Sequence, residues 1–240
     1  MSSTLHSIST SRKSIRSQSF GSVLDWSFEN PLLKGRNDRA QFRLTFFQSG
    51  IVRIQISRFE EFQSNPYSVI SQPVETELSL IEHENHLEIH SSLLQVKVRL
   101  DSFQLSFFTS EGRLLNSDDP LSVSWIGSEI SNYKQVQKGE KFIGLGEKTG
   151  NLDRFGKAYT HWNTDYFAYG VGDDPLYMSI PFYMGVHENG AYGIFLDNTH
   201  KSAFNFGAST NRFTYFSAED GDLDYYFIYH PDIKGIIRSY

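Results

Sequence analysis

Apolar and polar residues alternate with a period of two through much of this chain. Residues 52–57 read Val-Arg-Ile-Gln-Ile-Ser, and residues 94–100 read Leu-Gln-Val-Lys-Val-Arg-Leu. Such alternation is typical of a β-strand with one face on a core and the other in water. Residues 121–125 follow the same pattern, and no segment before residue 142 has a sustained period of 3.6. The sequence therefore predicts an all-β fold, an antiparallel β-sandwich.

Turn residues join these segments into hairpins. Residues 78–82 and 87–90 flank a short polar turn, and Glu188-Asn189-Gly190 separates predicted strands at 179–186 and 191–196. Asn-Gly favours the positive φ angles of tight hairpin turns. Further strands are predicted at residues 105–109, 203–206, 212–217 and 223–229. The last of these is too apolar to have one wet face, so we expect it in the centre of a sheet.

The two ends of the chain differ from this β region. Residues 1–20 are rich in serine, contain no acid and predict a flexible tail, which leaves residues 21–229 for the sandwich. Residues 230–240 predict the start of a helix, because Pro231 and Asp232 suit a helix N-terminus. Since the sequence stops where this helix begins, we expect the chain to be the front part of a longer protein.

Composition excludes several function classes. The net charge is −6 without a basic patch, which argues against binding to nucleic acid. The chain has no cysteine, and therefore neither disulfides, nor thiolate metal sites, nor a cysteine nucleophile. No apolar run approaches the ~18 residues needed to span a bilayer. We expect a cytoplasmic protein, because no apolar signal segment is recognisable, and we expect it to need no cofactor.

Three histidines lie close together at residues 83, 86 and 90. Their spacing raises the question of metal ligation. They fall on and beside a predicted hairpin turn rather than on one helical face, so we interpret them as exposed turn residues and predict no metal site.

The candidate functional residues lie in a glycine- and aromatic-rich stretch between residues 142 and 176. Glycine permits shaped loops, and long ordered loops usually carry a function. The carboxylate of Asp165 could accept two sugar hydroxyls, whereas Asp173-Asp174-Pro175 predicts a turn. Asn163 could instead be structural, in an Asx turn. The predicted substrate-binding residues are Trp162, Asn163, Thr164, Asp165, Tyr166 and Phe167.

Several motifs in this stretch and beyond it resemble those of one enzyme family. They include residues 144–148 (GLGEK), 159–165 (YTHWNTD), 192–199 (YGIFLDNT) and 223–226 (LDYY). In their order and spacing they resemble the N-terminal β-sandwich of glycoside hydrolase family 31.

This resemblance implies a galactose-mutarotase-like sandwich that precedes and packs against a catalytic (β/α)₈ barrel. It also implies a retaining, exo-acting hydrolase of α-linked oligosaccharides or glucosides, most often an α-glucosidase. The catalytic aspartates of such enzymes belong to the barrel, so this chain is expected to hold no catalytic residue and to be inactive alone. Asp165 matches the loop-tip aspartate that helps to shape the sugar-binding pocket.

Two other functions are compatible with the residues. The chain could be a complete, non-catalytic carbohydrate-binding module that uses the aromatic loop as a platform. It could also be a free-standing mutarotase, which needs an acid and a base across the sugar. Only His161 or His187, paired with Glu188, could supply that chemistry.

Overall fold

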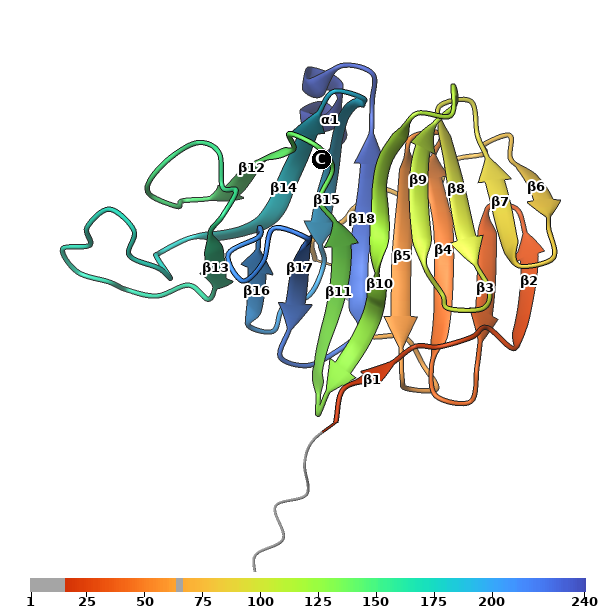
Figure 1. Ribbon diagram of the computed structural model, residues 1–240, viewed down its shortest axis with the longest axis horizontal. Helices are drawn as coiled ribbons and strands as arrows, with labels where there is room; N and C mark the ends of the chain where they lie inside the picture. The colour runs from red at the N-terminus through yellow and green to blue at the C-terminus, as the bar shows by residue number, and fades with distance from the viewer. Residues whose placement is uncertain (1–15, 64–66) are drawn as a thin grey trace, which may run out of the picture.

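The computed structural model describes residues 16–63 and 67–240, which form two antiparallel sheets and one short helix (Figure 1). The first sheet contains β1 (Gln18–Ser19), β6 (Ser79–Glu82), β7 (His86–His90), β8 (Leu94–Arg99), β9 (Leu105–Thr109), β10 (Leu114–Ile126), β11 (Glu129–Gln135), β13 (Ala158–His161), β16 (Ser202–Asn205) and β17 (Phe213–Ala218). The second contains β2 (Asp25–Glu29), β3 (Leu32–Arg36), β4 (Gln41–Gln48), β5 (Ile51–Ser57), β12 (Lys141–Gly146), β14 (Ser179–His187), β15 (Gly190–Leu196) and β18 (Leu223–Tyr229).

The strand order places segments from distant parts of the chain side by side. The first sheet runs β13-β16-β17-β11-β10-β9-β8-β7-β6, with β1 paired to β10 off this path. The second sheet runs β12-β14-β15-β18-β5-β4-β3-β2. The predicted all-β, antiparallel sandwich is therefore confirmed.

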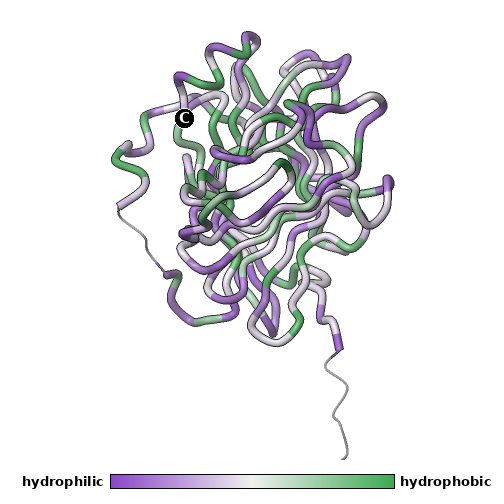
Figure 2. Tube along the Cα trace, turned by 90° about the vertical axis from the view of Figure 1, so that its left-hand side faces the viewer, coloured by the Kyte–Doolittle hydropathy of each residue, from purple (hydrophilic) through white to green (hydrophobic). Residues whose placement is uncertain are grey.

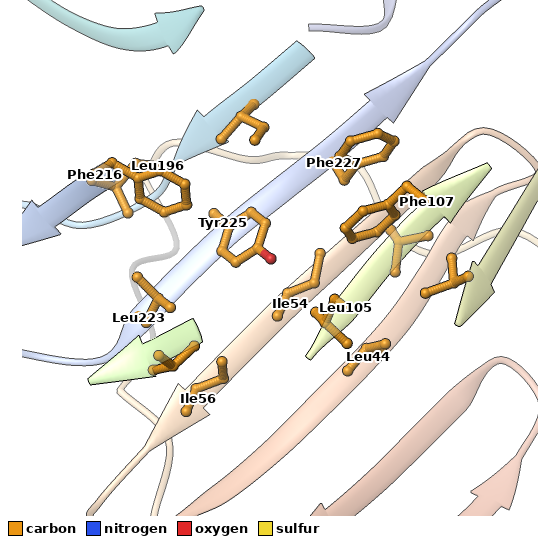
Figure 3. Packing of buried hydrophobic residues seen from close by; sticks show 14 of the residues in the cluster. Leu44, Ile54, Ile56, Leu105, Phe107, Leu196, Phe216, Leu223, Tyr225 and Phe227 are labelled. Carbon is orange, nitrogen blue, oxygen red and sulfur yellow. The ribbon is translucent and has the colours of Figure 1, made fainter. Parts of the chain in front are cut away.

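The core lies between the two sheets, where their inward side chains meet. Figure 3 shows residues of β4, β5, β15 and β18 pointing toward residues of β9 and β17. Phe107 of β9 stacks on Phe227 of β18, with ring centroids 3.9 Å apart, and both side chains are fully buried. All seven residues of β18 are buried, and the strand lies between β15 and β5. This confirms the prediction of a central strand from residues 223–229.

Local turn chemistry agrees with the observed hairpin at residues 187–190. β14 and β15 pair from His187 opposite Gly190, so the connection is the two residues between them. Gly190 has a φ of +143°, a conformation that residues with a side chain resist.

After β18, the short helix α1 (Ile233–Ser239) follows the extended residue Asp232 and buries Ile236. In the described part of the chain, no helix has the length and apolar character needed to cross a membrane.

The N-terminal boundary of the sandwich differs from the predicted one. Gln18 and Ser19 pair with β10, and Phe20 is buried, with its ring 4.2 Å from that of Phe103. The boundary at residue 21 was therefore too late, because one aromatic side chain in a serine-rich segment gains enough from burial to dock it. The rest of the predicted tail, residues 1–15, lies outside the described residues.

β10 is also longer than the segment predicted at residues 121–125. Its first half contains Asn116 and Asp118, both buried. The Asp118 carboxylate accepts a hydrogen bond from Lys134 Nζ at 2.7 Å, and Asn116 donates to the Tyr192 hydroxyl at 3.0 Å. Buried polar groups need such partners. These partners come from β11 and β15, so alternation within β10 could not reveal this part of the strand.

Candidate functional site

Two loops project from the same end of the sandwich. Residues 147–157 connect β12 to β13, and residues 162–178 connect β13 to β14. Both loops extend to the left of the sheets in Figure 1, and they face the viewer in Figure 2. The second loop contains all six predicted substrate-binding residues.

A buried ion pair holds the two loops together at their base. The Lys148 ammonium donates to Asp174 Oδ1 and, at 2.7 Å, to the carbonyl oxygen of Thr160. Asp174 Oδ2 in turn accepts from the backbone N–H of Thr160. The Lys148 side chain is only 1% exposed. One carboxylate thus joins the first loop, strand β13 and the far end of the second loop, a role that the prediction of a simple turn at Asp173-Asp174-Pro175 missed.

Asn163 and Thr164 make further hydrogen bonds across the base of the second loop. Asn163 Oδ1 accepts from the backbone N–H of Ser179 at 2.8 Å, and the Thr164 N–H donates to the carbonyl of Leu176 at 2.9 Å. The Thr164 hydroxyl donates to the carbonyl of Trp162 at 2.8 Å. Asn163 therefore has the structural role that the sequence left open, although its bond crosses the loop base and does not form an Asx turn.

The first part of the second loop, residues 162–167, presents a carboxylate and aromatic rings to the outside. Asp165 is exposed and makes no hydrogen bond or ion pair with any other residue that the structure describes. Phe167 is 92% exposed, while Trp162 and Tyr166 are about half exposed. The Tyr177 hydroxyl donates to the carbonyl of Tyr166 at 2.8 Å, which supports this segment from within the loop. A supported segment with exposed rings is typical of a surface that contacts another molecule or domain.

Asp165 lines neither of two cavities found among the described residues. A cavity of ≈ 390 Å³ at the base of the loop is lined by Trp162 and Asn163 together with residues of the 198–202 segment. A larger cavity of ≈ 610 Å³ lies on the outer face of the second sheet beside α1, and none of the predicted site residues lines it. Of the predicted set, the structure thus places Trp162 and Asn163 at one cavity and leaves the other four outside it.

The histidines considered for mutarotase chemistry are poorly placed for acid–base catalysis. His161 is buried against the ring of Phe204, and burial, with the charge of Lys148, lowers the pKa of its imidazole to about 3. That ring is neutral at pH 7 and cannot donate a proton there as an acid. His187 is engaged with the carbonyl of Leu115 at 2.8 Å. The geometry gives the mutarotase hypothesis no support.

Comparison with known proteins places this arrangement in a family. The model of the glycosyl hydrolase 31 N-terminal galactose mutarotase-like domain matches residues 41–205. The chain belongs to this family. The resemblance that the sequence motifs carried is therefore confirmed, and the two-sheet sandwich is the fold expected of a GH31 N-terminal domain.

Relatives of this GH31 N-terminal domain include several named enzymes. Alpha-glucosidase 2 of Bacillus thermoamyloliquefaciens is 34% identical over 206 residues, which cover 85% of this chain and 26% of that protein. The alpha-xylosidase XylQ of Lactiplantibacillus pentosus is 28% identical over 203 residues, covering 82% of this chain and 26% of that protein. A GH31 dextranase of Flavobacterium johnsoniae, solved with isomaltotriose, superposes with a TM-score of 0.86 at 33% identity, covering 92% of this chain and 28% of that one.

The chain spans about a quarter of the length of the curated relatives it matches. Those relatives include an alpha-glucosidase and an alpha-xylosidase, so they support a glycoside hydrolase and leave its sugar open. The roles of the six predicted substrate-binding residues stay predictions.

Proposed function

We propose that this domain is the front part of a retaining, exo-acting α-glycosidase, and specifically of an α-glucosidase. The 34% identity to an alpha-glucosidase over most of this chain supports the activity. The proposed substrate is an α-linked oligosaccharide or glucoside, in keeping with the isomaltotriose bound by the similar dextranase. The catalytic groups would come from a (β/α)₈ barrel against which this sandwich packs.

The role of the domain in this proposal is to bring Asp165 to the rim of the sugar-binding pocket. One observation carries the proposal: the Lys148–Asp174 ion pair fixes the base of the loop, while Asp165, directly after the hydrogen-bonded Thr164, is exposed and has no partner in the described chain. A carboxylate held on a fixed base can accept hydrogen bonds from two hydroxyls without losing much conformational entropy. The exposed rings beside it would pack against the sugar or the barrel.

The test is the variant Asp165→Ala in the protein that carries both this domain and the barrel. A hydrogen bond to a charged group contributes about 1.5–3 kcal/mol, so kcat/KM for a disaccharide should fall about 10- to 100-fold. The matched control is Asp38→Ala, because Asp38 is also exposed but lies in the turn between β3 and β4. An unchanged kcat/KM in Asp165→Ala would show that Asp165 does not belong to the sugar-binding pocket.

A second candidate is a stand-alone carbohydrate-binding module, which the exposure of Trp162, Tyr166 and Phe167 favours. Calorimetric titration of the 240-residue chain with maltose or isomaltotriose separates the two functions. The glycosidase proposal predicts little binding, because the barrel would supply most of the pocket. Saturable binding that Trp162→Ala abolishes would instead establish the binding module.

A further inference from the structure

Far from the loops, β7 carries a cluster of polar side chains on the outer face of the first sheet. Leu87 and Ile89 point into the core and are fully buried, so His86, Glu88 and His90 share the opposite face of the strand. His83, from the turn before β7, stacks its ring on His86 with centroids 4.2 Å apart. The sequence interpretation of these histidines as exposed turn residues therefore misses their convergence.

The imidazole nitrogens surround a single carboxylate. The Nε2 atoms of His86 and His90 lie 3.1 Å and 3.4 Å from oxygens of Glu88, and that of His83 lies 3.8 Å away. Ligand atoms bound tetrahedrally to zinc at about 2.1 Å are separated from one another by about 3.4 Å. One ligand atom from each of His83, His86 and Glu88 lies within 4.8 Å of the other two, so modest side-chain rotation could bring these three to such spacings, whereas His90 is not part of this group.

One neighbouring cation competes with a metal ion for this cluster. The Lys97 ammonium lies 2.9 Å from Glu88 Oε1. Lys97 is about one-third exposed, and its flexible side chain can turn into solvent. Arg99, opposite His86 in the neighbouring strand, is occupied by Asp101 at 2.7 Å. A metal ion would therefore have to displace Lys97.

We propose that His83, His86 and Glu88 form a binding site for a divalent transition-metal ion of the zinc type, with water completing its coordination. Imidazole and carboxylate are ligands that zinc, copper and nickel share, whereas magnesium and calcium prefer oxygen alone. The bound ion ties the turn before β7 to the strand itself, near the edge of the first sheet at β6. The bound ion has a structural role: a ligand that binds the folded state and not the unfolded chain stabilises the folded state.

The experiment is a calorimetric titration of the untagged 240-residue chain with Zn²⁺, using Mg²⁺ as a parallel titrant. We expect one Zn²⁺ per chain, a higher melting temperature with Zn²⁺, and no saturable Mg²⁺ binding. His83→Gln and His86→Gln should each weaken Zn²⁺ binding at least about 10-fold. The control is His200→Gln, since His200 is exposed in another part of the molecule and should not change the affinity.

Lys97→Met gives the proposal a second, opposite test. Removing the ammonium that competes for Glu88 should tighten Zn²⁺ binding by about 10-fold, whereas an ordinary surface histidine would not respond. Circular dichroism confirms that each variant is folded. The proposal is overturned if the folded wild-type chain binds no Zn²⁺, or if His83→Gln and His86→Gln bind it as tightly as the wild type.

Discussion

Replacing Lys148 by methionine tests whether the buried ion pair sets the position of the candidate loop. Methionine has a similar length and keeps most of the apolar packing, but it cannot donate to Asp174 or to the Thr160 carbonyl. Asp174 would keep its bond from the Thr160 N–H and lose its counter-charge in a site where its side chain is 15% exposed.

The size of the effect follows from these contacts. Each hydrogen bond from a charged donor contributes about 1.5–3 kcal/mol, and breaking a buried ion pair by removing one partner costs about 3–5 kcal/mol. We expect Lys148→Met to destabilise the loop base by about 4 kcal/mol. The double variant Lys148→Met with Asp174→Asn should recover at least about 1 kcal/mol of this loss, because it leaves no unpaired buried charge.

Two measurements report the loss. Urea unfolding gives the global free energy, and hydrogen exchange at the Thr164 amide, which bonds Leu176, reports opening confined to the loop. Lys157→Met is the control, because Lys157 lies at the other end of the same loop as Lys148 and is exposed. If the folded Lys148→Met chain shows wild-type exchange at Thr164 and an unchanged urea midpoint, the ion pair does not hold the loop.

Two further predictions concern the sandwich itself. Burial raises the pKa of Glu140 from its ordinary value of 4.5 to about 7, although the Tyr192 hydroxyl donates to it at 2.6 Å. The folded state therefore binds this proton more tightly than the unfolded state. The free energy of unfolding that this proton contributes is fully present below pH 4.5. It falls by about 3 kcal/mol as the pH rises through 7. Glu140→Gln should flatten that part of the profile of unfolding free energy against pH, and a profile parallel to wild type would contradict the argument. Phe107→Ala should cost about 3–5 kcal/mol in urea unfolding, whereas Phe167→Ala, at a 92% exposed ring, should change stability by less than about 0.5 kcal/mol. Equal losses of unfolding free energy in the two variants would contradict a buried Phe107 and an exposed Phe167.

The sequence by itself determined the elements whose stability is local or depends on one simple pattern. Strands β5 and β8 follow from strict alternation, and the hairpin between β14 and β15 follows from Asn189-Gly190. β18 could be placed in the centre of a sheet because a continuous apolar strand has no polar face to offer to water. The choice of residues 162–167 as the candidate loop likewise rested on local composition and on the family motifs.

The tertiary structure decided every feature that depends on a partner distant in the chain. Asp118 can be buried in β10 only because Lys134 reaches it from β11. Asp174 anchors the loop only because it accepts a hydrogen bond from Lys148, which lies 26 residues earlier in the sequence. Neither partner is marked by periodicity or turn chemistry. A buried charge is stable only when another charge or donor meets it at hydrogen-bond distance. That distance is set by how the sheets pack, which is why the sequence predicted the loop and only the structure showed what holds it.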